Sequence, residues 1–114
     1  MDLKALSQLG RLEKEFEIND QLKVKLHTPS NGEQQSILLT ATVESNDALL
    51  RYVRLQVSTL VYATTEINGQ KYPVNELQDF YSNLQHAVLN QIYDKYSELA
   101  DEQGNTLESL KKKI

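Results

Sequence analysis

The side chains of this 114-residue chain that could perform chemistry are two histidines and a scatter of carboxylates. His27 and His86 fall in different expected elements, and neither stands in a His-x3-His or His-Glu-x-x-His spacing. A metal site would therefore need carboxylates from distant segments. The chain has no cysteine, which excludes disulfides, zinc-cysteine sites and thiol catalysis. We expect no metal and no cofactor.

The carboxylates favour solvent rather than catalysis. Glu98, Asp101 and Glu102 recur at helical spacing and form the solvated acidic face of a helix. A general acid needs an apolar pocket, and no pattern here predicts one. Serine, histidine and aspartate occur without a nucleophile-elbow motif, and the four glycines form no phosphate-binding loop. The sequence predicts a protein that is not an enzyme.

Composition narrows the class of protein further. The formal net charge is −4, and the only basic cluster is Lys111-Lys112-Lys113, so we expect no nucleic-acid partner. No run approaches the roughly 20 apolar residues that cross a bilayer, and Met1-Asp2-Leu3-Lys4 does not open a signal peptide, so we expect no membrane association. The length and 39% hydrophobic content suit a single domain over 1–114.

The elements begin with a β-hairpin over residues 15–26. Alternation places five apolar side chains on one face, namely Phe16, Ile18, Leu22, Val24 and Leu26. A three-residue loop, Asn19-Asp20-Gln21, keeps that face unmixed. The expected cross-strand pairs are Ile18 with Leu22, Phe16 with Val24, Glu17 with Lys23, and Glu15 with Lys25.

Two helices are expected after the hairpin. Ser30 and Glu33 match a capping box for a helix through about Val43. Its expected buried side consists of Ile37, Leu38 and Ala41. A second helix restarts at Ser45-Asn46-Asp47, and its expected buried face consists of Leu49, Val53, Val57, Leu60 and Val61.

The second half of the chain predicts another hairpin and further helices. Asn68-Gly69 is a two-residue turn signal. It would pair Ile67 with Gln70, Glu66 with Lys71, and Thr65 with Tyr72. Asn75 is expected to cap the next helix, Ser82-Asn83 to break it, and Gly104 to end the one after. The predicted fold is α+β and mostly helical, with an N-terminal β-hairpin and a second short hairpin packed with four to five helices.

Both termini carry apolar stripes that suit docking. Leu3, Leu6, Leu9 and Leu12 mark a short helix within 1–12, and Thr106 can cap a last helix over 106–114 that carries Leu107, Leu110 and Ile114. Each stripe either packs back on the domain or docks on another chain. Tyr93 lies about 100° from the stripe through Val88, Ile92, Tyr96 and Leu99 and is free for a partner. The candidate partner interface is Leu3, Leu6, Leu9, Tyr93, Leu107 and Leu110.

The order of these elements carries a family resemblance. Leu22-Lys23-Val24-Lys25-Leu26 leads into a polar capped helix, and then into a long helix ending in Ile67-Asn68-Gly69. Asn75-Glu76-Leu77 and a helix containing Leu84 follow. Over roughly residues 15–100 the chain resembles the small tail assembly chaperones and baseplate hub assembly proteins of tailed bacteriophages.

The resemblance implies a non-enzymatic assembly factor. Its partners would be other phage tail or baseplate proteins, met in the cytoplasm of the infected bacterial host, and a homo-oligomer is a further option. The alternative is a structural or adaptor subunit of the tail or baseplate, which would be found in the virion.

Overall fold

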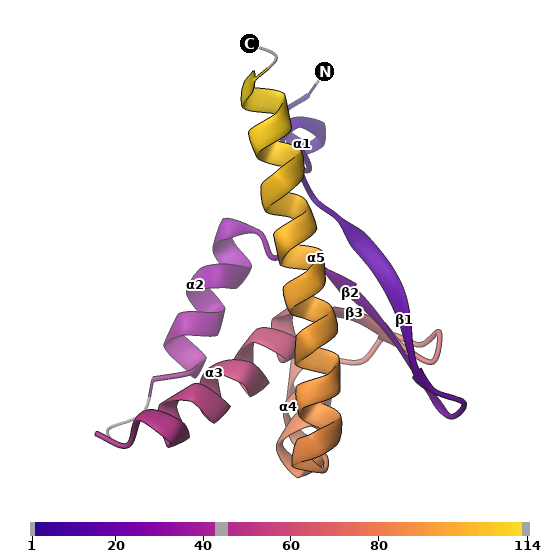
Figure 1. The fold of residues 1–114 in the computed structure, drawn as a ribbon, viewed down its shortest axis with the longest axis vertical. Helices are drawn as coiled ribbons and strands as arrows, with labels where there is room; N and C mark the ends of the chain where they lie inside the picture. The colour runs from indigo at the N-terminus through magenta and orange to yellow at the C-terminus, as the bar shows by residue number, and fades with distance from the viewer. Residues whose placement is uncertain (1, 43–45, 113–114) are drawn as a thin grey trace.

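The computed structural model describes residues 2–42 and 46–112 and has an α+β fold, as the sequence predicts (Figure 1). In chain order the elements are α1 (Leu3–Leu6), β1 (Glu13–Asn19), β2 (Leu22–His27), α2 (Asn31–Thr40), α3 (Ala48–Ala63), β3 (Thr64–Ile67), α4 (Val74–Asn83) and α5 (His86–Lys112). The three strands form one antiparallel sheet in the order β1-β2-β3.

The strands of the N-terminal hairpin have the predicted register from Glu15 to Glu17. Phe16 pairs with Val24, and the pairs of Glu17 with Lys23 and Glu15 with Lys25 are also confirmed. The prediction was wrong at the loop. Asn19 pairs with Leu22, and a bulge at Ile18 takes up the extra residue. The Asn19 side chain stabilises this tighter turn, since its Oδ1 accepts a hydrogen bond from the backbone N–H of Gln21 at 2.8 Å.

The second predicted hairpin is wrong beyond its turn. Asn68 and Gly69 do adopt positive φ angles of 51° and 79°, as a tight turn requires. Ile67 bridges Gln70, but no strand continues past it. β3 instead joins the first sheet, so Glu66 lies opposite Lys25 rather than Lys71. Pairing with β2 buries Ile67 in the core, whereas a free hairpin would have left both its faces in water.

The core lies between one face of the sheet and helices α3, α4 and α5. Val24 and Leu26 from β2 meet Leu60 of α3 and Ile92 of α5, and all four side chains are fully buried. α4 adds Tyr81, whose hydroxyl lies 2.6 Å from the Thr64 hydroxyl. Burial raises the pKa of Tyr81 to about 12, although the hydrogen bond to Thr64 opposes the shift. This side chain therefore stays a neutral donor inside the core.

Helix α2 and the N-terminal half of α3 form an arm beside this core (Figure 1). The predicted capping box is confirmed, because Ser30 and Glu33 bond each other's backbone N–H groups. Two predicted core positions are wrong, since Leu38 is 56% exposed and Leu49 is 71% exposed. α2 buries a narrow stripe centred on Ile37, whose carbonyl accepts a hydrogen bond from Ser58 of α3 at 2.7 Å. In the first turn of α3 both Leu49 and Leu50 are exposed.

Three predicted helix caps in the C-terminal half are wrong. α4 does end at Asn83, as predicted, but Pro73 occupies its N-cap position in place of Asn75. α5 runs through Gly104 without interruption, so that residue is not a C-cap. Thr106 is likewise inside α5, where its hydroxyl bonds the Glu102 carbonyl at 2.9 Å.

Candidate protein-binding surfaces and a polar network

The segments that carry the predicted terminal leucines lie at one end of the molecule, where α1 stands beside the C-terminal part of α5 (Figure 1). The two segments meet at Gly10, which has a φ of +81°. Its carbonyl accepts a hydrogen bond from Gln103 at 3.0 Å, and a Cβ at this position would come within 3.1 Å of Leu107. The only helix that forms in 1–12 among the described residues is the four-residue α1, and no separate helix forms over the described part of 106–114.

These leucines are open to solvent. Leu3 and Leu9 are 83% and 74% exposed, and Leu6 and Leu107 are also exposed although Leu107 touches Gly10. The side chain of Leu110 and the whole of Ile114 lie outside the described residues. The structure therefore places Gly10 next to Leu107 and Gln103 of α5, and α1 itself buries none of its residues.

Tyr93 is less available to a partner than its helical position indicates. It packs against the core cluster, with ring centroids 6.3 Å from Tyr52 and 5.8 Å from Tyr96. Burial, reinforced by Tyr52, raises the pKa of Tyr93, and burial together with Tyr93 raises the pKa of Tyr96. Within this row Tyr52 is the exposed ring.

A second apolar surface was missed from the sequence. It consists of four exposed leucines, which we call the arm leucines: Leu38, Leu39, Leu49 and Leu50. The first two close α2 and the others open α3, so all four lie where the arm turns. The helical spacing of Leu38 and Leu49 predicted core positions, and only their exposure in the folded chain reveals a surface. Clusters of exposed large apolar side chains mark interaction sites.

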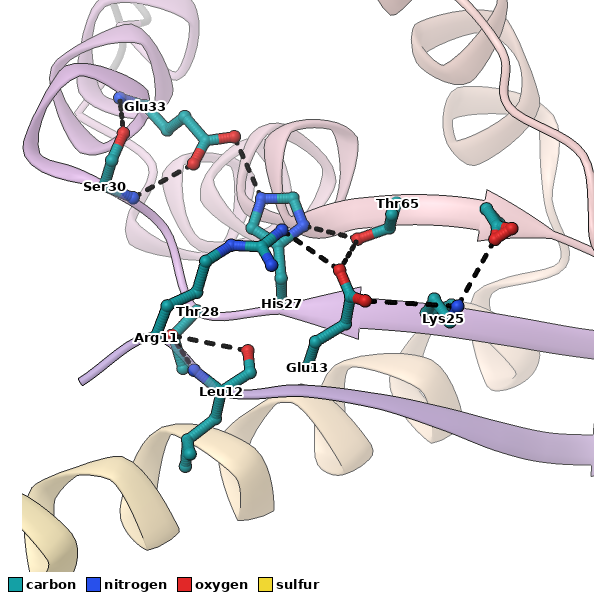
Figure 2. A network of polar contacts seen from close by, with 10 residues as sticks. Arg11, Leu12, Glu13, Lys25, His27, Thr28, Ser30, Glu33 and Thr65 are labelled. Atoms are coloured by element: carbon teal, nitrogen blue, oxygen red, sulfur yellow. Dashed lines mark hydrogen bonds and ion pairs between the residues drawn. The ribbon is translucent and has the colours of Figure 1, made fainter. Parts of the chain in front are cut away.

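A polar network links β1, β2, β3 and the start of α2 (Figure 2). The buried His27 is its centre, with Nδ1 2.7 Å from the Thr65 hydroxyl and Nε2 2.9 Å from a Glu33 carboxylate oxygen. Thr65 lies 3.1 Å from Glu13, which also pairs with Arg11 at 3.0 Å. The sequence placed no partner near His27, because these contacts join residues from four separate elements.

Lys25 extends the network along the sheet. Its ammonium lies 3.9 Å from Glu13 and 3.4 Å from Glu66. Burial tends to raise the pKa of Glu13, but the hydrogen bond from Thr65 and the charge of Arg11 hold it below its ordinary value. The network therefore alternates acidic and basic groups across all three strands.

Donor and acceptor roles in this network follow from the charge of Glu33. Burial tends to raise the pKa of Glu33, but hydrogen bonds from the Ser30 backbone and from His27 hold it lower, so Glu33 is an acceptor. His27 then donates from Nε2. Thr65 has one proton to give, either to His27 Nδ1 or to Glu13. Both contacts of Thr65 are hydrogen bonds at once only when His27 carries a proton on each ring nitrogen.

A cleft of about 520 Å³ lies beside the network, lined in part by Arg11, His27, Ser30, Glu33 and Gln103. A hydroxyl, an imidazole and a carboxylate in a row could activate a nucleophile. Here, however, the Thr65 hydroxyl is shared with Glu13, and both ring nitrogens of His27 are already engaged. The arrangement fixes α2 to the sheet and leaves no unpartnered imidazole nitrogen for a substrate.

The comparisons with known proteins give no relative. No family model, no curated protein and no solved structure matches this chain. Within residues 2–42 and 46–112, no group of three or more histidine or carboxylate side chains could hold a metal ion. No helix in the described part of the chain is long and apolar enough to cross a membrane.

Proposed function

We propose that this chain is a non-enzymatic assembly factor that works through protein-protein contacts. The observation that carries the proposal is the set of arm leucines, which expose four large apolar side chains at the end of α2 and the start of α3. The terminal leucines supply a second surface of the same kind. Exposed apolar side chains gathered at two places favour binding to another protein over catalysis in a cleft.

The element order supports a finer proposal about the partners. A hairpin followed by a capped helix and a helical body resembles the tail assembly chaperones and baseplate hub assembly proteins of tailed bacteriophages. We therefore propose phage tail or baseplate proteins as partners, met in the cytoplasm of the infected host. The alternative is a permanent structural or adaptor subunit, which would use the same surfaces.

Site-specific photo-crosslinking during particle production tests the proposal. A photoreactive amino acid at Leu39 should crosslink to a tail or baseplate protein, whereas the same group at Gln91, exposed on α5, should not. Equal crosslinking from both positions, or none from Leu39, would contradict protein binding by the arm.

Mass spectrometry of purified mature particles separates the two roles. An assembly factor should be absent from the particle although it crosslinks during assembly. Presence at a fixed stoichiometry would establish the structural subunit instead.

A further inference from the structure

A groove beside the arm leucines indicates what kind of segment binds there. It has a volume of about 210 Å³ and lies between α3 and α4 at the end of α2. Four α3 side chains line it at positions i, i+3, i+4 and i+7, namely Leu50, Val53, Arg54 and Val57. Gln78 and Ser82 of α4 line the opposite wall and bond each other at 3.2 Å.

The dimensions of the groove suit side chains rather than a small molecule. Ligand pockets usually occupy about 300–1,000 Å³, which exceeds this groove. The α3 residues that line it span about two helical turns. An amphipathic helix presents its anchoring side chains over the same distance, and grooves between helices accept such anchors.

The charge of the groove specifies the partner further. Arg54 is the one charged residue among those that line it. Its guanidinium makes no ion pair or hydrogen bond with any described residue, although the chain as a whole carries a net charge of −4. The other groove side chains are apolar or neutral. A carboxylate beside an apolar anchor therefore complements this groove, because it would pair with Arg54 while the anchor packs on Leu50 and Val53.

We propose that this groove binds an acidic amphipathic helix of a partner protein, with its apolar anchors on the α3 stripe and a carboxylate on Arg54. This inference rests on the proposed function, since it names the class of partner segment that the arm receives.

Two synthetic helical peptides test the proposal directly. Both carry leucines at i, i+3 and i+7, and one has glutamates flanking them where its twin has lysines. The glutamate peptide should bind at least tenfold more tightly by fluorescence anisotropy. In NMR spectra its binding should shift the backbone amide signals of Val53, Arg54 and Ser82 most. Equal binding of the two peptides, no binding at millimolar concentration, or shifts confined to other surfaces would overturn the proposal.

A matched pair of variants tests the charge. Arg54→Glu should weaken the glutamate peptide at least tenfold and strengthen the lysine peptide. Arg51→Glu changes the same residue type on the same helix outside the groove and should alter either affinity less than threefold. If both substitutions change the peptide affinities equally, the preference for the glutamate peptide comes from the overall charge of the arm, and the proposed role of Arg54 is wrong. If Leu39 crosslinks a partner while the glutamate peptide fails to bind, the inference fails and the proposed function stands.

Discussion

Val24 is the residue at which the sheet and the core meet. It lies in the central strand between Phe16 of β1 and Ile67 of β3, and its side chain is fully buried. We expect Val24→Asp to lower the free energy of unfolding by several kcal/mol, because it buries a carboxylate without a partner. Lys23→Gln, on the opposite face, should cost less than about 0.5 kcal/mol. Urea unfolding measures both, and near wild-type stability of Val24→Asp would contradict the assigned face.

The carboxylate of Glu33 makes the free energy of unfolding depend on pH. Its pKa is lowered in the folded protein, so the unfolded chain binds more protons as the pH falls below the ordinary glutamate value of about 4.3. The contribution of this carboxylate is therefore present above that pH and is lost as the pH falls through the folded pKa. Glu33→Gln should be less stable than wild type at pH 7, and the difference should shrink by pH 3.

Urea unfolding at the two pH values measures that difference. Glu15→Gln is the control, because Glu15 makes no hydrogen bond or ion pair with any described residue. Its difference from wild type should stay small at both pH values. A Glu33→Gln difference that remains constant with pH would show that the contacts to Ser30 and His27 do not depend on the charge.

At the scale of elements, two glycines occupy contrasting positions: Gly104 lies inside helix α5 and Gly69 lies in a turn. A Cβ at either position would meet no atom within 4 Å, but only Gly69 has a positive φ. We expect Gly104→Ala to raise the free energy of unfolding by about 0.5–1 kcal/mol, because alanine is the better helix former. Gly69→Ala should lower it, because its turn needs a left-handed conformation. Destabilisation by Gly104→Ala would indicate that α5 ends there, as its sequence suggests.

Helix starts give a second comparison at this scale. The Ser30 side chain accepts a hydrogen bond from the Glu33 N–H at 3.1 Å, whereas Asn75 lies inside the first turn of α4 and caps nothing. Ser30→Ala should cost about 1 kcal/mol. Asn75→Ala should change the free energy of unfolding by less than about 0.5 kcal/mol. Thermal unfolding of both variants measures these changes. An equal loss of stability in the two variants would show that Asn75 caps α4 after all.

At the scale of the whole molecule, the arm can be altered without disturbing the core. Leu49 is exposed in the first turn of α3, where an acidic side chain is favoured by the helix dipole. Leu49→Asp should therefore keep the free energy of unfolding within about 0.5 kcal/mol of wild type while it abolishes crosslinking from Leu39. Leu60→Asp, at a fully buried position of the same helix, should unfold the protein. Intact crosslinking in Leu49→Asp would show that the arm leucines are not the contact.

Local patterns were enough to predict much of this fold. Alternation around Phe16 and Val24 gave the hairpin register, because inward and outward faces repeat every two residues. Ser30 and Glu33 marked the start of α2, because a capping box is complete within four residues. The Asn68-Gly69 turn was equally local, since both residues accept a positive φ.

The surfaces and the polar network depended on distant contacts. Leu49 has the helical spacing of a core residue, but it is exposed because no element in the described part of the chain buries it. His27 shows no local sign of a site, since Thr65 and Glu33 reach it from different elements.

The sequence by itself therefore determined the hairpin pairs from Glu15 to Glu17, the positive-φ turn at Asn68-Gly69 and the N-cap of α2, because each depends on neighbouring residues. Only the tertiary structure decided that β3 extends the first sheet, that α5 continues past Gly104, and which leucines remain exposed. Those outcomes depend on which distant segment packs over or pairs with each element. The spacing of apolar residues along the sequence is the same whether or not another segment covers them.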